Sequence, residues 1–151
     1  MLNFEVKDAT RILSVARSLN TYKAPFSIVE RYRLIDNGIE PEATVQIEAD
    51  GRYIHEAANG AGPVDALASV LKKALLPLFP FLENVALIDY RAEIIDAKLG
   101  TATSVMVTIV FSDGVEVWKG YSSHENINLA SFHVLVDGME YAIHRHNQKQ
   151  G

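Results

Sequence analysis

The sequence predicts an α+β fold made of two duplicated β-β-β-α units that pack together, preceded by a short N-terminal helix. Three strand-like segments followed by one helix-like segment occur twice along the chain, in the same order. The two copies share local marks, namely Tyr32-Arg33 and Tyr90-Arg91 in the opening strand and Asp50-Gly51 and Asp113-Gly114 at the hairpin turn. A three-stranded sheet with one helix buries little apolar surface by itself, so we expect the two units to cover each other.

The first 25 residues are predicted to form an N-terminal helix and a linker segment. Apolar residues at mostly helical spacing place the helix at residues 8–19. Residues 26–146 are predicted to form the main domain, with unit one at about 26–80 and unit two at about 85–146.

Unit one is expected to open with an extended strand from Phe26 to Ile35 that ends at Asp36-Asn37-Gly38. The segments 44–48 and 52–57 alternate around a turn and predict a hairpin. Helical periodicity then runs from Val64 to Leu78, before Pro80 ends it.

Unit two repeats this order. We expect strands over residues 85–95, 104–111 and 115–120, followed by a helix that Asn126 caps. Gly138 is a weak point of that helix, and a polar tail is expected to follow it.

Composition narrows the classes of function. The chain has 151 residues, 48% of them hydrophobic and 22% charged, which is typical of one globular domain with its own core. Its net charge of −5 and the lack of a basic cluster argue against nucleic-acid binding. The absence of cysteine excludes a disulfide framework and a thiol nucleophile. No leader or bilayer-spanning stretch is recognisable, so we expect a cytoplasmic protein without a membrane partner.

A glycine-rich segment before the first predicted long helix is the clearest local motif. Gly60 and Gly62 flank Ala61, and Pro63 occupies a position that suits the first residue of a helix. Bare backbone N–H groups beside a helix N-terminus can bind an anion or a carboxylate. An ordinary glycine turn before a helix explains the same spacing and stays open at this point.

No group of residues in the sequence has the pattern of a catalytic site or a metal site. His144 and His146 have the spacing of a metal-binding pair, but they lie in the expected polar tail, where such histidines seldom bind metal. His55 and His133 stand alone and are expected to be structural. We therefore expect no catalytic residue, no metal and no cofactor.

Several of these segments, in their order, resemble the C-terminal regulatory domain of 2-isopropylmalate synthase and citramalate synthase. The resemblance extends from about residue 4 to residue 143. It rests on residues 60–67, Leu87-Ile88-Asp89-Tyr90, Gly100-Thr101-Ala102, Trp118 before a serine-containing turn, Asn126-Ile127 through Ala130-Ser131, and Asp137-Gly138. The stretches Phe4-Glu5 with Asp8-Ala9, Tyr22 to Phe26 and Glu30 to Arg33 resemble the segment that joins the barrel of citramalate synthase to its regulatory domain, and favour that branch.

The resemblance implies an allosteric feedback domain that is not itself catalytic. Such a domain dimerises, binds leucine or isoleucine, and inhibits a catalytic acyltransferase barrel, which here would act in cis or in trans. By position, the resemblance assigns ligand binding to Gly60, Ala61, Gly62, Val64, Leu87, Tyr90, Ile94, Thr101, Thr103 and Ile127. For each apolar member of this set, a simple role in the core is an equally good explanation.

Two departures from the family pattern keep other functions open. Ala61 stands where the family usually has asparagine, and Glu125 lies beside the expected start of the second long helix. A structural dimerisation domain without ligand binding is therefore one alternative. A small α+β enzyme that uses Asp65 or Glu125 is another, although no second catalytic group accompanies either residue.

Overall fold

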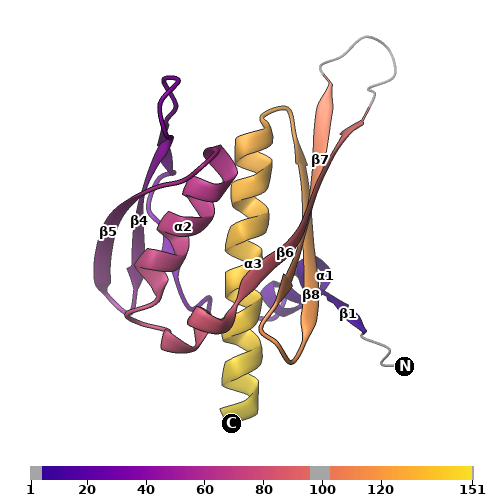
Figure 1. The fold of residues 1–151 in the computed structure, drawn as a ribbon. Coiled ribbons are helices and arrows are strands. Elements are labelled where there is room, and N and C mark those ends of the chain that lie inside the picture. Colours follow the sequence, from indigo (N-terminus) through magenta and orange to yellow (C-terminus); the bar gives the residue numbers. More distant parts are fainter. Residues whose placement is uncertain (1–4, 96–102, 151) are drawn as a thin grey trace.

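The structure, a computed structural model, describes residues 5–95 and 103–150. Two sheets lie on either side of the two long helices α2 and α3 (Figure 1). One sheet has the strand order β1-β8-β7-β6, and in the other β4 pairs with β2 and β3 on one side and with β5 on the other. The predicted α+β fold with a duplicated β-β-β-α arrangement and an N-terminal helix is confirmed.

Unit one is built around a long hairpin. Strands β4 (Glu42–Ala49) and β5 (Arg52–Asn59) are joined by the two-residue turn Asp50-Gly51. Both turn residues have positive φ, 50° and 75°, as the twist of a tight hairpin requires. Every second residue of β4 is buried, so one face of this sheet packs on α2 and the other is accessible.

The opening strand of unit one is interrupted. It forms β2 (Ser27–Ile28) and β3 (Arg33–Ile35), which pair with opposite ends of β4. Between them Glu30 adopts a left-handed backbone with φ of 60°, which breaks the extended run. The prediction of one continuous strand from Phe26 to Ile35 is therefore wrong.

Helix α2 (Pro63–Leu75) begins as the glycine-proline segment predicts. Gly62 is the N-cap residue in extended conformation, and Pro63 is the first helical residue. The helix buries one apolar face against β4 and β5. A short 3₁₀ helix, η1 (Pro80–Asn84), leads into the second unit.

Unit two consists of β6 (Ala86–Ile95), β7 (Ser104–Ser112), β8 (Val117–His124) and α3 (Ile127–Gln150). Asn126 caps α3, because its side-chain oxygen accepts the N–H groups of Asn128 and Leu129 at 2.9 and 3.2 Å. Strand β8 continues past residue 120, and α3 includes the segment that the sequence predicts to be a polar tail. These two predicted boundaries are wrong.

Gly138 lets α3 approach the sheet closely, so it is a packing residue rather than a weak point. A Cβ atom at this position would lie 2.2 Å from Cζ of Phe111 on β7. The carbonyl oxygen of Gly138 accepts the indole N–H of Trp118 at 3.1 Å. Phe111 and Trp118 are both fully buried, so the contact lies in the centre of the core of unit two.

The N-terminal segment packs on unit two rather than on unit one. Strand β1 (Val6–Asp8) pairs in parallel with β8, and α1 (Ala9–Arg17) packs on α3 and β8. Asp8 caps α1 by accepting the N–H of Arg11 at 3.0 Å and also accepts the hydroxyl of Tyr121 at 3.0 Å. The boundary predicted at residue 25 stays a prediction.

Two carboxylates of α3 hold the segment around α1. Arg17 donates to Asp137 at 2.8 Å and to Glu140 at 3.1 Å, and Tyr22 donates to Glu140 at 2.6 Å. Burial and the hydrogen bond to Glu140 raise the pKa of Tyr22. Burial opposes the charge of Arg17, but its hydrogen bonds to Asp137 and Glu140 outweigh this and raise its pKa. Both groups therefore keep their protons at neutral pH and hold α1 against α3.

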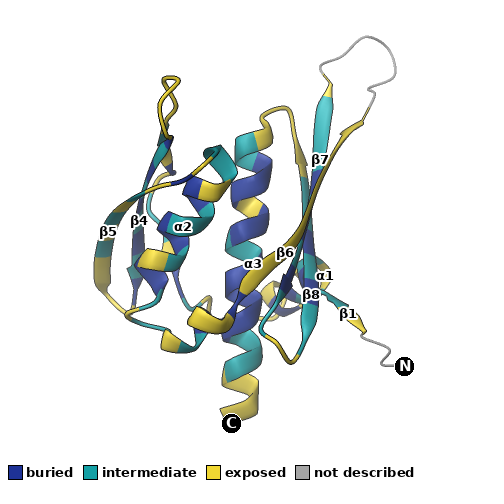
Figure 2. Cartoon of the chain, viewed as in Figure 1, coloured by how far each residue is buried: buried dark blue, intermediate teal, exposed yellow. Residues whose placement is uncertain are grey.

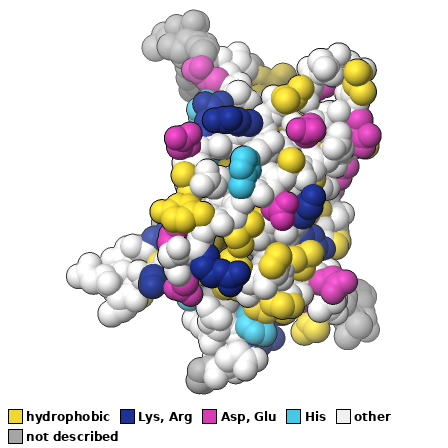
Figure 3. All heavy atoms as spheres, turned by 90° about the vertical axis from the view of Figure 1, so that its left-hand side faces the viewer, with side chains coloured by type: hydrophobic (Ala, Val, Ile, Leu, Met, Phe, Trp, Pro, Cys, Tyr) yellow, Lys and Arg dark blue, Asp and Glu magenta, His cyan; other side chains and the backbone are white. Residues whose placement is uncertain are grey.

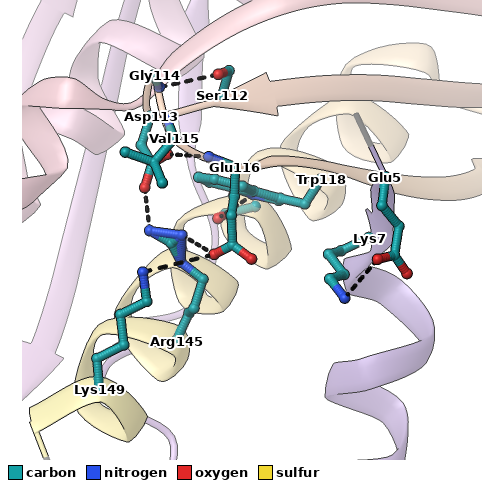
Figure 4. Close-up of polar contacts among 11 residues, drawn as sticks. Glu5, Lys7, Ser112, Asp113, Gly114, Val115, Glu116, Trp118, Arg145 and Lys149 are labelled. Atoms are coloured by element: carbon teal, nitrogen blue, oxygen red, sulfur yellow. Dashed lines mark hydrogen bonds and ion pairs between the residues drawn. The ribbon is translucent and has the colours of Figure 1, made fainter. Parts of the chain in front are cut away.

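The C-terminal part of α3 is tied to the β7–β8 turn by Arg145 (Figure 4). Arg145 pairs with Asp113 and Glu116, and its guanidinium lies 5.6 Å from the ring centroid of Trp118. Asp113 also accepts the N–H groups of Val115 and Glu116 at 2.9 and 2.8 Å. Burial opposes ionisation of Asp113, but these N–H groups and the charge of Arg145 outweigh it and lower its pKa.

The accessible face that carries β4 and β5 mixes acidic, basic and apolar side chains (Figure 3). A nucleic-acid-binding surface would instead gather positively charged side chains. Among the described residues, none of the helices combines the length and the apolar character needed to cross a bilayer.

Candidate functional site

Strand β6 is the least covered element of the fold. All ten of its residues are exposed, whereas alternate residues of its neighbour β7 are buried (Figure 2). Helix α3 packs on β7 and β8 and leaves the edge of the sheet open. An uncovered edge strand that carries large apolar side chains marks a surface that binds a ligand or another chain.

The register of the β6–β7 pair shows which side chains face the helices. Leu87, Tyr90 and Ile94 pair directly with Phe111, Ile109 and Val105 of β7. Because directly paired residues point to the same face of a sheet, the three β6 side chains share the inner face with the buried core of β7. They nevertheless remain 36%, 37% and 73% exposed.

A groove of about 380 Å³ runs between α2 and the start of β6. Asp65, Ser69 and Lys72 line it from α2, Leu87 lines it from β6, and Met139 lines it from α3. The Nζ atom of Lys72 donates to the carbonyl oxygens of Glu83 and Val85, at 3.0 and 2.9 Å, and so holds the start of β6 against α2. The groove therefore joins the start of α2 to the first of the predicted β6 ligand residues.

The glycine loop at the start of α2 is partly occupied by its own helix. The N–H of Ala61 donates to the carboxylate of Asp65 at 2.8 Å. Gly60 is buried, and a Cβ atom there would lie 2.2 Å from the backbone nitrogen of Ala66, so its glycine serves close packing on α2. Gly62 has open space around it, and its φ of −144° needs no glycine.

The N-terminal part of α3 meets β6 through a side-chain hydrogen bond. The hydroxyls of Tyr90 and Ser131 lie 2.9 Å apart, and Ser131 is fully buried. This bond positions the tyrosine ring over the first turns of α3. Ile127, in the first turn, is 40% exposed.

The structure places eight of the ten predicted ligand residues in three groups. Thr101 lies outside the described residues, and Thr103 is exposed just before β7. The others occupy the start of α2, the inner face of β6 and the first turn of α3, and Leu87 alone lines the groove between α2 and β6. Ligand binding by these residues stays a prediction.

Sequence reasoning missed Ser69 and Lys72 of the groove and considered Asp65 only for the enzymatic alternative. Asp65, Ser69 and Lys72 follow the spacing i, i+4, i+7 and therefore lie on one helical face. This polar stripe beside the apolar face was the signal that could have identified them.

His144 and His146 point to different neighbours. The ring of His144 lies edge-on to Tyr22 at 5.6 Å between centroids, and His146 stacks on Phe81 at 3.7 Å. Within the described part of the chain, no cluster of three or more histidine or acidic residues could hold a metal ion. Both histidines thus have packing roles in α3.

Comparisons with known proteins show the family of the chain. Residues 5–143 match the model of the LeuA allosteric (dimerisation) domain. The chain is 36% identical to (R)-citramalate synthase of Geobacter sulfurreducens over 98% of its own length and 29% of that protein. It is 33% identical to the (R)-citramalate synthases of Aquifex aeolicus and Streptomyces coelicolor, over 93% and 94% of its length and 28% of each relative. The chain thus spans less than a third of these relatives, and it belongs to the LeuA allosteric (dimerisation) domain family.

Proposed function

We propose that this chain is a feedback-regulatory module that binds a branched-chain amino acid, leucine or isoleucine. The observation that carries the proposal is the uncovered inner face of β6, where Leu87, Tyr90 and Ile94 remain exposed. Leu87 borders α2 in the groove, and Tyr90 bonds to α3. An apolar surface next to a few fixed polar groups is the usual form of a small-molecule site.

The chemistry of the groove matches a zwitterion with an aliphatic side chain. Leu87 and Met139 offer apolar contact to a branched side chain. The N-terminus of α2 favours a carboxylate, and the carboxylate of Asp65 in the same turn attracts an ammonium group. Because Asp65 already accepts the N–H of Ala61, the ligand's carboxylate would meet the remaining N–H groups of the first turn.

Regulation would follow from a population shift. An effector held between α2 and β6 touches both units, so it favours the relative arrangement of the units in which the groove is best formed. We infer that this arrangement controls a catalytic barrel of the 2-isopropylmalate or citramalate synthase type, in cis or in trans. The names of the relatives, and the fraction of their length that the chain spans, support this inference.

Effector binding is expected to raise the stability of the chain. Leucine or isoleucine at about one hundred times its dissociation constant should add about 2.7 kcal/mol to the free energy of unfolding. Replacing Gly62 with valine places a branched side chain in the open space before α2, so the added stability should vanish. Thermal unfolding with and without each amino acid measures both effects.

The control for this experiment lies in the geometry of Gly62. Because its φ is extended and no atom lies within 4 Å of the added Cβ, the Gly62→Val variant should unfold cooperatively near the melting temperature of the unliganded parent. Lysine and glutamate should stabilise the parent much less. Equal stabilisation by all four amino acids, or an undiminished response in Gly62→Val, would contradict the proposed site.

The exposed face of β6 is also proposed to form a homodimer interface. Ile94 is 73% exposed on a strand whose residues are all accessible, and a second copy of the chain would cover it with twofold symmetry. We expect the parent to be a dimer in light scattering and Ile94→Glu to be a monomer. The matched control is Ile39→Glu, which changes a side chain that is 74% exposed in the loop before β4 and should leave the dimer intact. A dimeric Ile94→Glu protein would place the interface elsewhere.

A second candidate function is dimerisation without ligand binding. The bonds from Ala61 to Asp65 and from Tyr90 to Ser131 already use polar groups that a ligand would need, and they favour this candidate. A parent that dimerises but shows no stabilisation by leucine or isoleucine would support it. The enzymatic alternative has less support, because Asp65 is engaged within its own helix turn.

A further inference from the structure

A second cavity lies on a different face of α3 from the β6 groove. It has a volume of about 570 Å³, within the range of small-molecule sites. Leu129, His133 and Val136 line it at the spacing i, i+4, i+7, whereas Ser131, which bonds to Tyr90, lies on another side of the helix. The other walls come from α1, β8 and the chain between β2 and β3.

The lining combines an apolar surface with charges of both signs. Ile28, Leu129 and Val136 are partly buried aliphatic residues that pack against the core and leave part of their surface to the cavity. The cations are Arg17 and Arg31, and the carboxylates are Glu30 and Asp137. This set matches a small molecule that carries a carboxylate, an ammonium group and a short aliphatic side chain.

The break in the opening strand of unit one brings two of these charges to the cavity. Glu30 has a left-handed backbone with φ of 60°, which is uncommon for a residue with a side chain. Arg31 follows it, 5.4 Å from the ring centroid of Tyr32. A continuous strand would instead alternate these residues between the two faces of the sheet.

The duplication of the fold gives each unit a tyrosine that contacts α3. Tyr32 and Tyr90 belong to the matching Tyr-Arg pairs of the two units. Tyr90 bonds to Ser131, and Tyr32 packs on the next residue of α3, Phe132, at 4.9 Å between ring centroids. Each unit therefore sets its Tyr-Arg segment against α3, and Phe132 also lines the second cavity.

We propose that the cavity between α1, residues 28–31, β8 and α3 is a second binding site, which takes an α-amino acid with a short aliphatic side chain. Arg17 and Arg31 bind its carboxylate, Glu30 and Asp137 bind its ammonium group, and the aliphatic wall binds its side chain. The residues are distinct from those of the β6 groove, so the site does not depend on the proposed function. A ligand carboxylate at Arg17 competes with Asp137 and Glu140, and so acts on the bonds that hold α1 to α3.

A titration observed through methyl groups distinguishes the two sites. The chain is labelled at the Ile, Leu and Val methyls and titrated with leucine and, separately, with isoleucine. Ile28, Leu129 and Val136 report on the cavity, Leu87 reports on the β6 groove, and Ile94 reports on the inner face of β6 beyond the groove. We expect saturable shifts in the cavity reporters with at least one of the two amino acids.

Two arginine variants test the assignment. Arg31→Ala should raise the dissociation constant measured at the cavity reporters at least tenfold. The dissociation constant measured at the Leu87 and Ile94 reporters should stay unchanged. Arg33→Ala removes a neighbouring exposed arginine that does not line the cavity, and it should change neither dissociation constant.

The outcomes separate the cavity from the proposed function. Shifts confined to Leu87 and Ile94 would overturn the second site and leave the proposed function standing. Saturable shifts confined to the cavity reporters, and weakened by Arg31→Ala alone, would support the second site and contradict the β6 groove. An absence of shifts with both amino acids would overturn both proposals. If Arg31→Ala and Arg33→Ala weakened ligand binding equally, the cause would be the net charge of the chain, and the second site would be overturned.

Discussion

Replacing Gly138 with alanine is expected to destabilise the chain by about 3 kcal/mol, although alanine is the better helix former. In an open helix the change would add about 1 kcal/mol of stability. Here the new Cβ would lie 2.2 Å from Cζ of Phe111, whose ring is fully buried and stacked near Trp118 at 6.1 Å between centroids. The ring has no space to move into, so overpacking outweighs the gain in helix propensity. Urea unfolding followed by the fluorescence of the single tryptophan measures the difference.

Two further variants test this explanation. Gly62→Ala adds the same atom where nothing lies within 4 Å, so its free energy of unfolding should stay within about 0.5 kcal/mol of the parent. Phe111→Leu combined with Gly138→Ala should recover part of the loss, because the smaller side chain leaves room for the methyl group. A Gly138→Ala protein as stable as the parent would show that α3 does not pack this closely on β7.

Replacing Arg145 with methionine is expected to cost about 2 kcal/mol. The side chain of Arg145 is 16% exposed, and its loss leaves the carboxylate of Asp113 without its cation and Glu116 with only the more distant Lys149. Breaking a fully buried pair costs about 3 to 5 kcal/mol, and partial exposure of Glu116 lowers that figure here. Chemical unfolding of the parent and of Arg145→Met gives the difference directly.

Lys149→Met is the matched control for this variant. The Nζ atom of Lys149 lies 4.0 Å from the same Glu116 carboxylate, but the side chain is 56% exposed, so its removal should cost less than about 0.5 kcal/mol.

The pKa of Asp113 is lowered in the folded state, so the folded chain binds fewer protons than the unfolded chain in acid. Stability should therefore fall as the pH drops below about 4, near the ordinary aspartate pKa, and Asp113→Asn should flatten this fall. Equal losses in Arg145→Met and Lys149→Met would rule out the turn contact.

The local elements follow from short-range rules, and this is why they could be predicted. Gly62-Pro63 starts α2, Asp50-Gly51 turns the β4–β5 hairpin, and Asn126 caps α3. In each case the signal and the structure that it produces lie within a few residues of each other. The duplicated order of the units was predictable for the same reason, because each unit carries its own copy of these signals.

Departures from the prediction arise where distant residues decide the outcome. The segment from residue 144 is polar and resembles a tail, but Arg145 finds its partners on the β7–β8 turn and the helix continues to Gln150. The break at Glu30 likewise depends on how β2 and β3 meet the two ends of β4. No local pattern in the sequence contains these contacts.

The sequence could predict which residues belong to the candidate site better than it could predict how those residues are arranged. The apolar pattern of Leu87, Tyr90 and Ile94 is that of a buried strand, and the sequence cannot show that α3 packs on β7 and β8 and leaves β6 exposed. The bond between Ala61 and Asp65 was equally hidden, because the same spacing is compatible with a loop open to a ligand. The exposure of the β6 side chains and the use of the Ala61 N–H by Asp65 depend on the folded structure.

The pairing of β1 with β8 has a consequence for the order in which this chain folds. Thr10 and Tyr121, which bond beside that pairing, are 111 residues apart, whereas the β4–β5 hairpin closes over two residues. Contacts of such long sequence separation carry the largest loop-closure entropy and form late. Until they form, β8 is an open edge that can recruit a strand from another chain, and the three-residue β1 then closes it. During synthesis, the residues of β1 leave the ribosome before those of β8, yet they would be among the last of this domain to reach their place in the sheet.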